Sequence, residues 1–268
     1  MRTNTFPTSW GNKWIFIIGM ILVSVFLLAK VGLGADRLIL WKIANEQCVA
    51  RGSDHRIPAP CLSVRLRSPP RASFVILKDL VGEGQVLAIP MDRISGIESP
   101  EVLKSAVGEL WLAAWHARHF VAGLLDADLA DDAIGLAINS SHARSQDQLH
   151  IHVDCISREV RDSLRRHLSE LSDKWSSHGF ALLGKRYQAI RLSESEFAER
   201  NLFALVASIT PEAAADMGAE TIVVTGATFP DGSHGFIVLE DRADRVPGDR
   251  AHGEDLLDHT CKIAAPVQ

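Results

Sequence analysis

The sequence predicts an α+β fold from three observations. Apolar and polar residues alternate strictly over 148–155, which is the period of a β-strand with one buried face. Two apolar runs, at 73–77 and 86–90, are separated by turn residues and predict a β-hairpin. After Ser157, a good N-cap, apolar residues recur at helical spacing as far as Trp175. Because helices and strands are interspersed without a repeating βαβ unit, an α+β arrangement is favoured over α/β.

The other elements follow from the same signals. A helical region is expected from Ser99 to Phe120, since Pro100 is tolerated in a first helical turn. The segment 49–70 is rich in Arg, Ser and Pro and is expected to be irregular. Further helical or strand-like pieces are expected at 36–46, 133–138, 187–192, 194–207, 211–219, 221–225 and 235–239.

The N-terminal region contains the apolar run WIFIIGMILVSVFLLAKV at 14–31. Such a run is long enough to cross about 30 Å of hydrocarbon as one helix. A cleaved signal peptide, with a poor cleavage site at 32–35, is the alternative, but the length of the run favours an uncleaved anchor. We therefore expect a tail at 1–13, a single transmembrane helix at 14–34, a juxtamembrane helix and linker at 35–70, and the main domain at 71–268.

The cysteines bear on the compartment of this domain. Cys48, Cys61, Cys155 and Cys261 are an even number and follow an export-like segment, which favours disulfides in an oxidising compartment. Three connectivities are open. A bridge between the first two cysteines would close a short loop, and the last two would then pair. Four buried free thiols in a cytoplasmic domain are the alternative. The net charge of −5 gives no indication of nucleic-acid binding.

The polar face of the 148–155 strand is the candidate functional site. His150 and His152 lie on it beside Gln148, with about 7 Å from one to the next. Imidazole changes charge near neutral pH, so this row suits nucleophilic or proton-transfer chemistry. The alternatives are a half-exposed strand whose histidines are incidental and a zinc site at these two histidines. His116 and His119 could also bind a metal, but no third ligand at suitable spacing accompanies them.

Several phrases of the sequence follow one another in a fixed order, namely FVILKDL, QVLAIP, RISGIESP, LAINS and QLHIHVDCI. In this order they resemble the histidine-triad superfamily of nucleotide hydrolases and transferases, and within it the bacterial CDP-diacylglycerol pyrophosphatases. The resemblance extends over nearly the whole chain, including the apolar N-terminal segment and the cysteine placement. It implies that 71–268 is a catalytic domain with a histidine-triad-like antiparallel sheet and flanking helices.

The resemblance also implies roles for single residues. The middle histidine of the family pattern corresponds to His150, the nucleophile, and His152 would assist at the phosphate or the departing oxygen. The first position is Gln148 instead of histidine, and an amide can form hydrogen bonds but cannot relay protons. Asp79 would bind the ribose hydroxyls, although its alternative is a plain turn carboxylate. Asn139, Ser145 and Gln146 would place the phosphate or orient the loop, and no metal or cofactor is implied.

The implied reaction is hydrolysis of CDP-diacylglycerol to CMP and phosphatidate through a cytidylyl-histidine. An anchor in a bacterial inner membrane, with the domain facing the periplasm, would hold it beside a lipid-linked substrate. One alternative is a nucleotidyltransferase that uses an acceptor other than water. The other is an inactive nucleotide- or lipid-binding domain, which Gln148 at the first histidine position favours. Histidine-triad relatives often form a two-fold arrangement, so a homodimer is also expected.

Overall fold

The computed structural model describes residues 36–49, 57–68, 72–176 and 179–264. The expected tail and transmembrane helix at 1–34 lie outside these residues. Across the described part of the chain, no helix has the length and apolar character needed to span a membrane.

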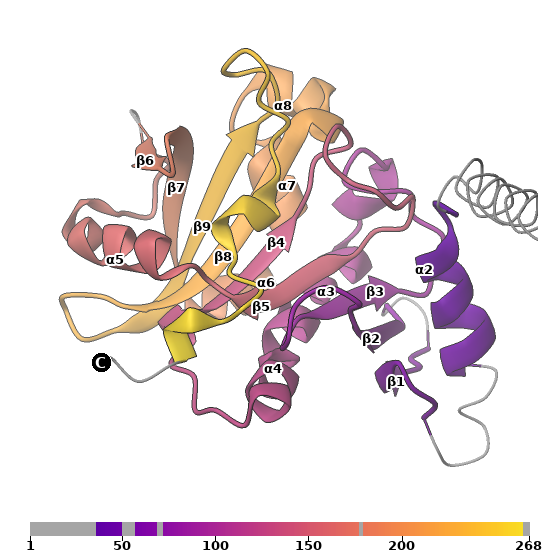
Figure 1. Ribbon diagram of the computed structural model, residues 1–268. Helices are drawn as coiled ribbons and strands as arrows, with labels where there is room; N and C mark the ends of the chain where they lie inside the picture. The colour runs from indigo at the N-terminus through magenta and orange to yellow at the C-terminus, as the bar shows by residue number, and fades with distance from the viewer. Residues whose placement is uncertain (1–35, 50–56, 69–71, 177–178, 265–268) are drawn as a thin grey trace, which may run out of the picture. The chain divides into compact units, whose positions relative to one another are not determined.

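Within the described residues, nine strands form one sheet in the order β1-β2-β3-β5-β4-β8-β9-β7-β6 (Figure 1). Every neighbouring pair is antiparallel. The α+β class and the antiparallel sheet with flanking helices are therefore confirmed. The strands are β1 (Cys61–Arg65), β2 (Phe74–Lys78), β3 (Val86–Pro90), β4 (Ile134–Ile138), β5 (Ile151–Cys155), β6 (Phe180–Leu182), β7 (Lys185–Ser193), β8 (Glu220–Thr228) and β9 (His234–Arg242).

The predicted hairpin is the pair β2–β3, which is in register from Phe74 opposite Pro90 to Lys78 opposite Val86. The expectation of irregular structure at 49–70 is wrong for β1, which pairs with the free edge of β2. A five-residue edge strand needs only a partner's unpaired main-chain groups, and its composition need not alternate.

The helices are α2 (Ile39–Lys42), which continues as the π-helix η1 (Ile43–Val49), α3 (Ser105–His116), α4 (Arg118–Leu125), α5 (Arg158–Arg166), α6 (Glu194–Glu199), α7 (Leu202–Ala207) and α8 (Pro211–Ala215). The 3-10 turns are η3 (Pro100–Leu103), η4 (Asp131–Ala133), η5 (Leu168–Glu170), η6 (Met217–Ala219), η7 (Gly253–Leu256) and η8 (Lys262–Ala264).

The helix predicted after Ser157 is α5, and the Ser157 hydroxyl accepts a hydrogen bond from the Val160 amide as an N-cap does. This helix ends at Arg166, so the prediction that it extends to Trp175 is wrong. Leu171 is nevertheless buried, in extended chain beyond the helix. Apolar side chains at helical spacing can therefore reach the core without a helix between them.

The two faces of the sheet are covered differently. Helices α3 and α4 pack on one face, behind β3 and β5 (Figure 1). The chain after β9, residues 243–264, is called the C-terminal segment. A Cβ atom at Gly226 would contact Trp115 of α3, whereas a Cβ atom at Gly135 would contact Leu257 of the C-terminal segment. Because Gly135 pairs with Thr225, the neighbour of Gly226, these two contacts lie on opposite faces. The C-terminal segment therefore covers the face that α3 leaves open.

That second face has one more cover. The helix at 39–49 packs on it over β2 and β3, in an apolar cluster that includes Leu77 and Leu87. Leu87 is the cross-strand partner of His152, so both side chains point to this face. The candidate site thus lies between the helix at 39–49 and the C-terminal segment.

Candidate active site

The strand expected at 148–155 is observed as β5 (Ile151–Cys155), so His152 lies in the strand and His150 directly precedes it. Every residue of β5 is buried, so the strand is covered on both faces. His150 is 9% exposed and His152 is 6% exposed. The alternation predicted correctly which residues share a face, but the second face is covered by protein. The expectation of a half-exposed strand is therefore wrong.

His150 is held with one nitrogen engaged and the other available. Its Nδ1–H donates a hydrogen bond to the main-chain oxygen of Gln148, over 2.7 Å. A carbonyl can only accept, so the proton is on Nδ1 and Nε2 carries a lone pair. Burial lowers the pKa of His150, and the Gln148 carbonyl and the charge of Glu254 oppose this effect. His150 is therefore a neutral imidazole at pH 7, with an Nε2 atom that could act as a nucleophile.

His152 lies beside it, with the two ring centroids 4.7 Å apart and the rings nearly edge to face. Its Nδ1 atom lies 3.1 Å from Glu254 Oε1, and its Nε2 atom is buried without a protein partner. Burial and the neighbouring His150 lower the pKa of His152 to about 3, while Glu254 opposes them. An unpartnered, buried ring nitrogen is a candidate contact for a substrate oxygen.

Glu254 comes from η7 in the C-terminal segment, which approaches β4 and β8 closely. A Cβ atom at Gly253 would lie 2.6 Å from the Thr221 hydroxyl, so only glycine allows this approach. The Asn139 amide donates to Glu254 Oε2 over 2.6 Å, and the Glu254 amide donates to Asn139 Oδ1 over 3.3 Å. Burial would raise the pKa of Glu254, but hydrogen bonding from His252, the neighbouring His152 imidazole and the Asn139 amide lower it to about 2. Glu254 is therefore a carboxylate.

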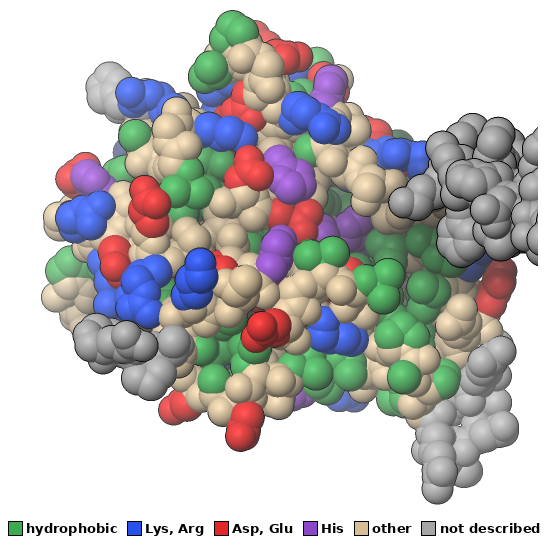
Figure 2. Space-filling view, in the orientation of Figure 1, with side chains coloured by type: hydrophobic (Ala, Val, Ile, Leu, Met, Phe, Trp, Pro, Cys, Tyr) green, Lys and Arg blue, Asp and Glu red, His purple; other side chains and the backbone are tan. Residues whose placement is uncertain are grey.

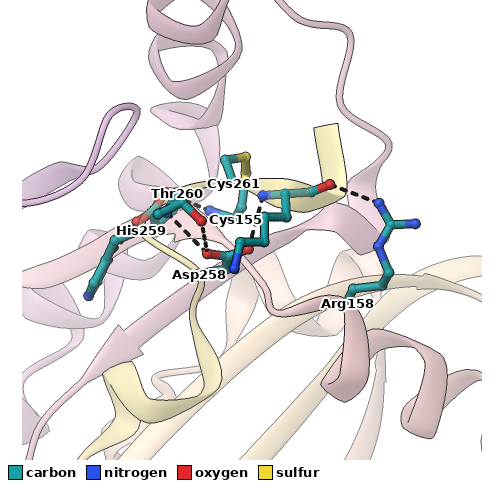
Figure 3. The surroundings of a disulfide bond; sticks show 8 residues. Cys155, Arg158, Asp258, His259, Thr260 and Cys261 are labelled. Atoms are coloured by element: carbon teal, nitrogen blue, oxygen red, sulfur yellow. Dashed lines mark hydrogen bonds and ion pairs between the residues drawn. A yellow bond between two sulfur atoms is a disulfide. The ribbon is translucent and has the colours of Figure 1, made fainter. Parts of the chain in front are cut away.

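The C-terminal segment is joined to β5 next to the histidines. His259 Nδ1 lies 2.8 Å from Asp154 Oδ2. Cys261 forms a disulfide with Cys155 (Figure 3). Around this disulfide, Asp258 accepts hydrogen bonds from the Thr260 hydroxyl and from two main-chain amides. The last strand residues and the last described turn therefore form one fixed unit.

The second disulfide joins Cys48 of the helix at 39–49 to Cys61 of β1. The Cα–Cα distances are 5.7 Å for this pair and 5.3 Å for Cys155 and Cys261. The alternative of four free thiols is therefore wrong, and the two disulfides indicate an oxidising compartment outside the cytoplasm.

Asp79 lies in the turn after β2, where its carboxylate is oriented by three donors. The amides of Leu80 and Val81 donate to Oδ1, and Gln85 Nε2 donates to Oδ2 over 2.5 Å. Gln85 Nε2 also lies 3.3 Å from His152 Nδ1. The structure therefore links Asp79 to the histidine pair through a glutamine that the sequence analysis did not identify.

Gln148 and the loop before β5 are placed around His150. The Gln148 amide donates to the main-chain oxygens of Pro90 and Asp92, so its Nε2 atom fastens the loop to the end of β3. Arg144, also not identified from the sequence, lines a small hollow beside His150 with Asn139 and Gln148. In the same loop, Ser145 is exposed and Gln146 is half-buried.

Figure 2 shows histidine and acidic side chains gathered at the middle of the face on which the C-terminal segment lies. Apart from Cys261, no residue of the segment 252–264 is among the site residues expected from the sequence. The signal for this part of the site in the sequence is the density of titratable residues at 252–259, which holds two histidines and three carboxylates. Among the residues that the structure describes, no cluster of three or more His, Cys, Asp or Glu side chains could hold a metal ion.

The fold and the site together define an α+β protein with a buried histidine pair arranged for nucleophilic group transfer. Comparison with known proteins identifies the family. The sequence profile of the CDP-diacylglycerol pyrophosphatases matches residues 35–265. A protein of Yersinia pestis described as a CDP-diacylglycerol pyrophosphatase is 35% identical over 262 residues, which cover 97% of this chain and 98% of that protein. The chain therefore belongs to the CDP-diacylglycerol pyrophosphatase family, and the resemblance noted in the sequence is confirmed.

Proposed function

We propose that this protein hydrolyses the pyrophosphate bond of CDP-diacylglycerol to CMP and phosphatidate, with His150 as the nucleophile. The reaction is the one for which its family and its Yersinia pestis relative are named. The observation that carries the assignment of His150 is the hydrogen bond from its Nδ1 atom to the Gln148 carbonyl. This bond leaves the Nε2 lone pair free for attack on phosphorus.

The proposed reaction has two steps. His150 Nε2 forms a bond to the phosphorus attached to cytidine, and the bond from that phosphorus to the phosphatidate oxygen breaks. Water then attacks the cytidylyl-histidine, releasing CMP and restoring His150. A covalent intermediate divides one difficult displacement into two easier ones. His152 Nε2, buried and without a protein partner, lies where it could contact the departing oxygen.

The remaining site residues have supporting roles in this proposal. Asp79 binds the ribose hydroxyls, Asn139 fixes the C-terminal segment through Glu254, and Gln148 orients the loop and supplies the carbonyl for His150. Ser145 and Gln146 are candidates for contact with the phosphate oxygens from the loop 142–147, and no metal is required for either step.

We further propose a histidine-triad-like catalytic domain, anchored by the apolar segment at 14–31 in a bacterial inner membrane and facing the periplasm. The two disulfides fit an oxidising compartment, and a single anchoring helix would bring the domain to its lipid-linked substrate. A homodimer, as in histidine-triad relatives, is part of the proposal and is tested by the mass of the purified protein in detergent.

The deciding experiment incubates the full chain with CDP-diacylglycerol in detergent, with metal chelated, and measures CMP. We expect CMP release by the wild type and a loss of at least about a thousandfold with His150→Ala. His142→Ala, in an exposed histidine of the preceding loop, is the matched control and should keep wild-type activity. If the wild type releases no CMP, the hydrolase proposal fails, and if His150→Ala is as active as the wild type, the nucleophile is another residue. CMP esters formed when an alcohol is added would identify a transferase instead.

A further inference from the structure

A single buried carboxylate, that of Glu254, has three imidazoles around it. Oε1 lies 3.1 Å from His152 Nδ1 and 3.9 Å from His259 Nε2, and Oε2 lies 3.4 Å from His252 Nε2. The Glu254 side chain is only 14% exposed. Of the three imidazoles, only that of His152 lies in β5, two residues after the proposed nucleophile.

The position of Glu254 is set by contacts on both sides. Asn139, at the end of β4, is joined to its carboxylate and to its main-chain amide, and Gly253 lets the segment lie directly on β8. Contacts with β4 and β8 therefore hold the Glu254 carboxylate next to His152. A carboxylate held against one imidazole nitrogen fixes the tautomer of the ring and stabilises its protonated form.

We propose that Glu254 is a positioning residue that holds the proton of His152 on Nδ1 and enables His152 Nε2 to protonate the departing phosphatidate. This inference deepens the proposed function and depends on it. It assigns the acid of the first step to a histidine–carboxylate pair that includes a residue from the C-terminal segment.

The protons balance in both steps. When the negatively charged substrate binds, His152 Nε2 takes up a proton from solvent. In the first step this proton passes to the phosphatidate oxygen as the phosphorus–oxygen bond breaks, while His150 Nε2 bonds to phosphorus. In the second step, neutral His152 Nε2 takes a proton from the attacking water as the bond between phosphorus and His150 breaks. Glu254 remains ionised throughout and stabilises the imidazolium form of His152 each time that form appears.

A competing contact exists for the same nitrogen. Gln85 Nε2 lies 3.3 Å from His152 Nδ1, and an amide N–H could donate to it only if the ring proton were on Nε2. Gln85 donates one of its two N–H groups to Asp79 over 2.5 Å. For His152 Nδ1, a hydrogen bond donated to the Glu254 carboxylate is stronger than one accepted from a neutral amide. The bond to Glu254 therefore decides the tautomer.

The charges around His152 determine its protonation. In the unliganded site, burial and His150 keep His152 neutral, and the nearby His252 and His259 also lower its pKa. Asp79 from the turn after β2 and Arg144 from the loop before β5 act on the neighbouring His150, and Asp154 on β5 pairs with His259. A bound diphosphate adds negative charges next to Nε2, so substrate binding shifts the pKa of His152 upward and Glu254 adds to that shift.

The first test measures CMP release from CDP-diacylglycerol by the full chain with Glu254→Gln. We expect kcat to fall about a hundredfold or more while KM changes little, because general acid catalysis contributes on that order. The control is Glu212→Gln, which makes the same change at an exposed carboxylate of α8 and should keep kcat within about threefold. A Glu254→Gln enzyme with kcat within the same range would overturn the proposal.

The second test separates a role through His152 from a structural one. If Glu254 acts only through His152, adding Glu254→Gln to His152→Ala should lower kcat no further. A further hundredfold loss in the double variant would show that Glu254 acts elsewhere. In the wild type, ¹⁵N spectra of labelled histidine should show His152 protonated on Nδ1 at pH 7, and protonation on Nε2 would contradict the proposal even if no variant folds. An inactive wild type would instead refute the proposed function.

Discussion

His259 Nδ1 lies 2.8 Å from Asp154 Oδ2, one residue away from the disulfide partner Cys155 on the strand. An ion pair and a covalent bond therefore connect the same two segments. The Asp154 contact raises the pKa of His259, so the imidazolium form is favoured in the folded protein. Because Glu254 lies between His259 and Asn139 in space, this connection also determines how firmly Glu254 is held against His152.

The disulfide between Cys155 and Cys261 should matter for both stability and activity. It spans 106 residues, and a loop of that length corresponds to about 4 to 5 kcal/mol of unfolding free energy in the chain-entropy view. We expect Cys155→Ala with Cys261→Ala to lose roughly that amount in urea denaturation and to have a lower kcat, since Glu254 is less restrained. The matched control removes Cys48 and Cys61, which span 13 residues, and should cost less stability and leave kcat within about twofold. Equal kcat values for the two double variants would contradict this prediction.

His252 should stabilise the folded protein in a pH-dependent way. Hydrogen bonds with Asp255 and Glu254 raise its pKa to about 9. A raised pKa in the folded state contributes stability that is complete below the unfolded value of about 6.5 and disappears as the pH rises through about 9. We expect His252→Gln to unfold at a lower temperature than the wild type at pH 6 and at a similar temperature at pH 9.5. A melting-temperature difference that is the same at both pH values would show that His252 is not protonated in the folded protein.

Local patterns predicted those parts of the fold that depend on neighbouring residues. The hairpin and the start of α5 follow from turn residues and from the Ser157 cap, and alternation placed the two histidines on one face. The end of α5 did not follow, because Leu171 is buried from extended chain. Nor did β1, whose partner is an edge formed later in the chain.

Only those site residues that lie in β5 or in the segments next to it were predicted from the sequence. Glu254 and His259 come from beyond β9, and no periodicity in the sequence connects them to His152. Gln85 directly precedes β3, and only the folded arrangement brings its side chain to Asp79 and His152. Long-range hydrogen bonds of this kind depend on strand order, which a single sequence does not encode locally.

Gln148 should act mainly through the backbone. Its Nε2 atom donates to the carbonyls of Pro90 and Asp92, and the side chain is fully buried. Gln148→Ala leaves two carbonyls without this donor, which we expect to cost about 1 to 3 kcal/mol in urea denaturation. Since the carbonyl that holds His150 belongs to the main chain, kcat should fall much less than in His150→Ala. A loss of activity as large as that of His150→Ala, with unchanged stability, would show that the amide takes a direct part in catalysis.

Asp79 should contribute to substrate affinity by binding the ribose hydroxyls. Its carboxylate is oriented by two main-chain amides and by Gln85, so it can accept a ribose hydroxyl without rearranging. One lost hydrogen bond to a charged group corresponds to about 1.5 to 3 kcal/mol, and therefore to a KM for CDP-diacylglycerol at least about tenfold higher in Asp79→Ala.

The 2′-deoxy form of the substrate distinguishes a ribose contact from a general effect of Asp79→Ala. For this substrate the wild type should show a raised KM, and the variant should show little further increase, because the hydroxyl that Asp79 would bind is absent. Glu83→Ala, in an exposed residue of the same turn, is the matched control and should bind both substrates as the wild type does. If Asp79→Ala raises the KM for both substrates by the same factor, Asp79 orients Gln85 and His152 and does not contact the 2′-hydroxyl.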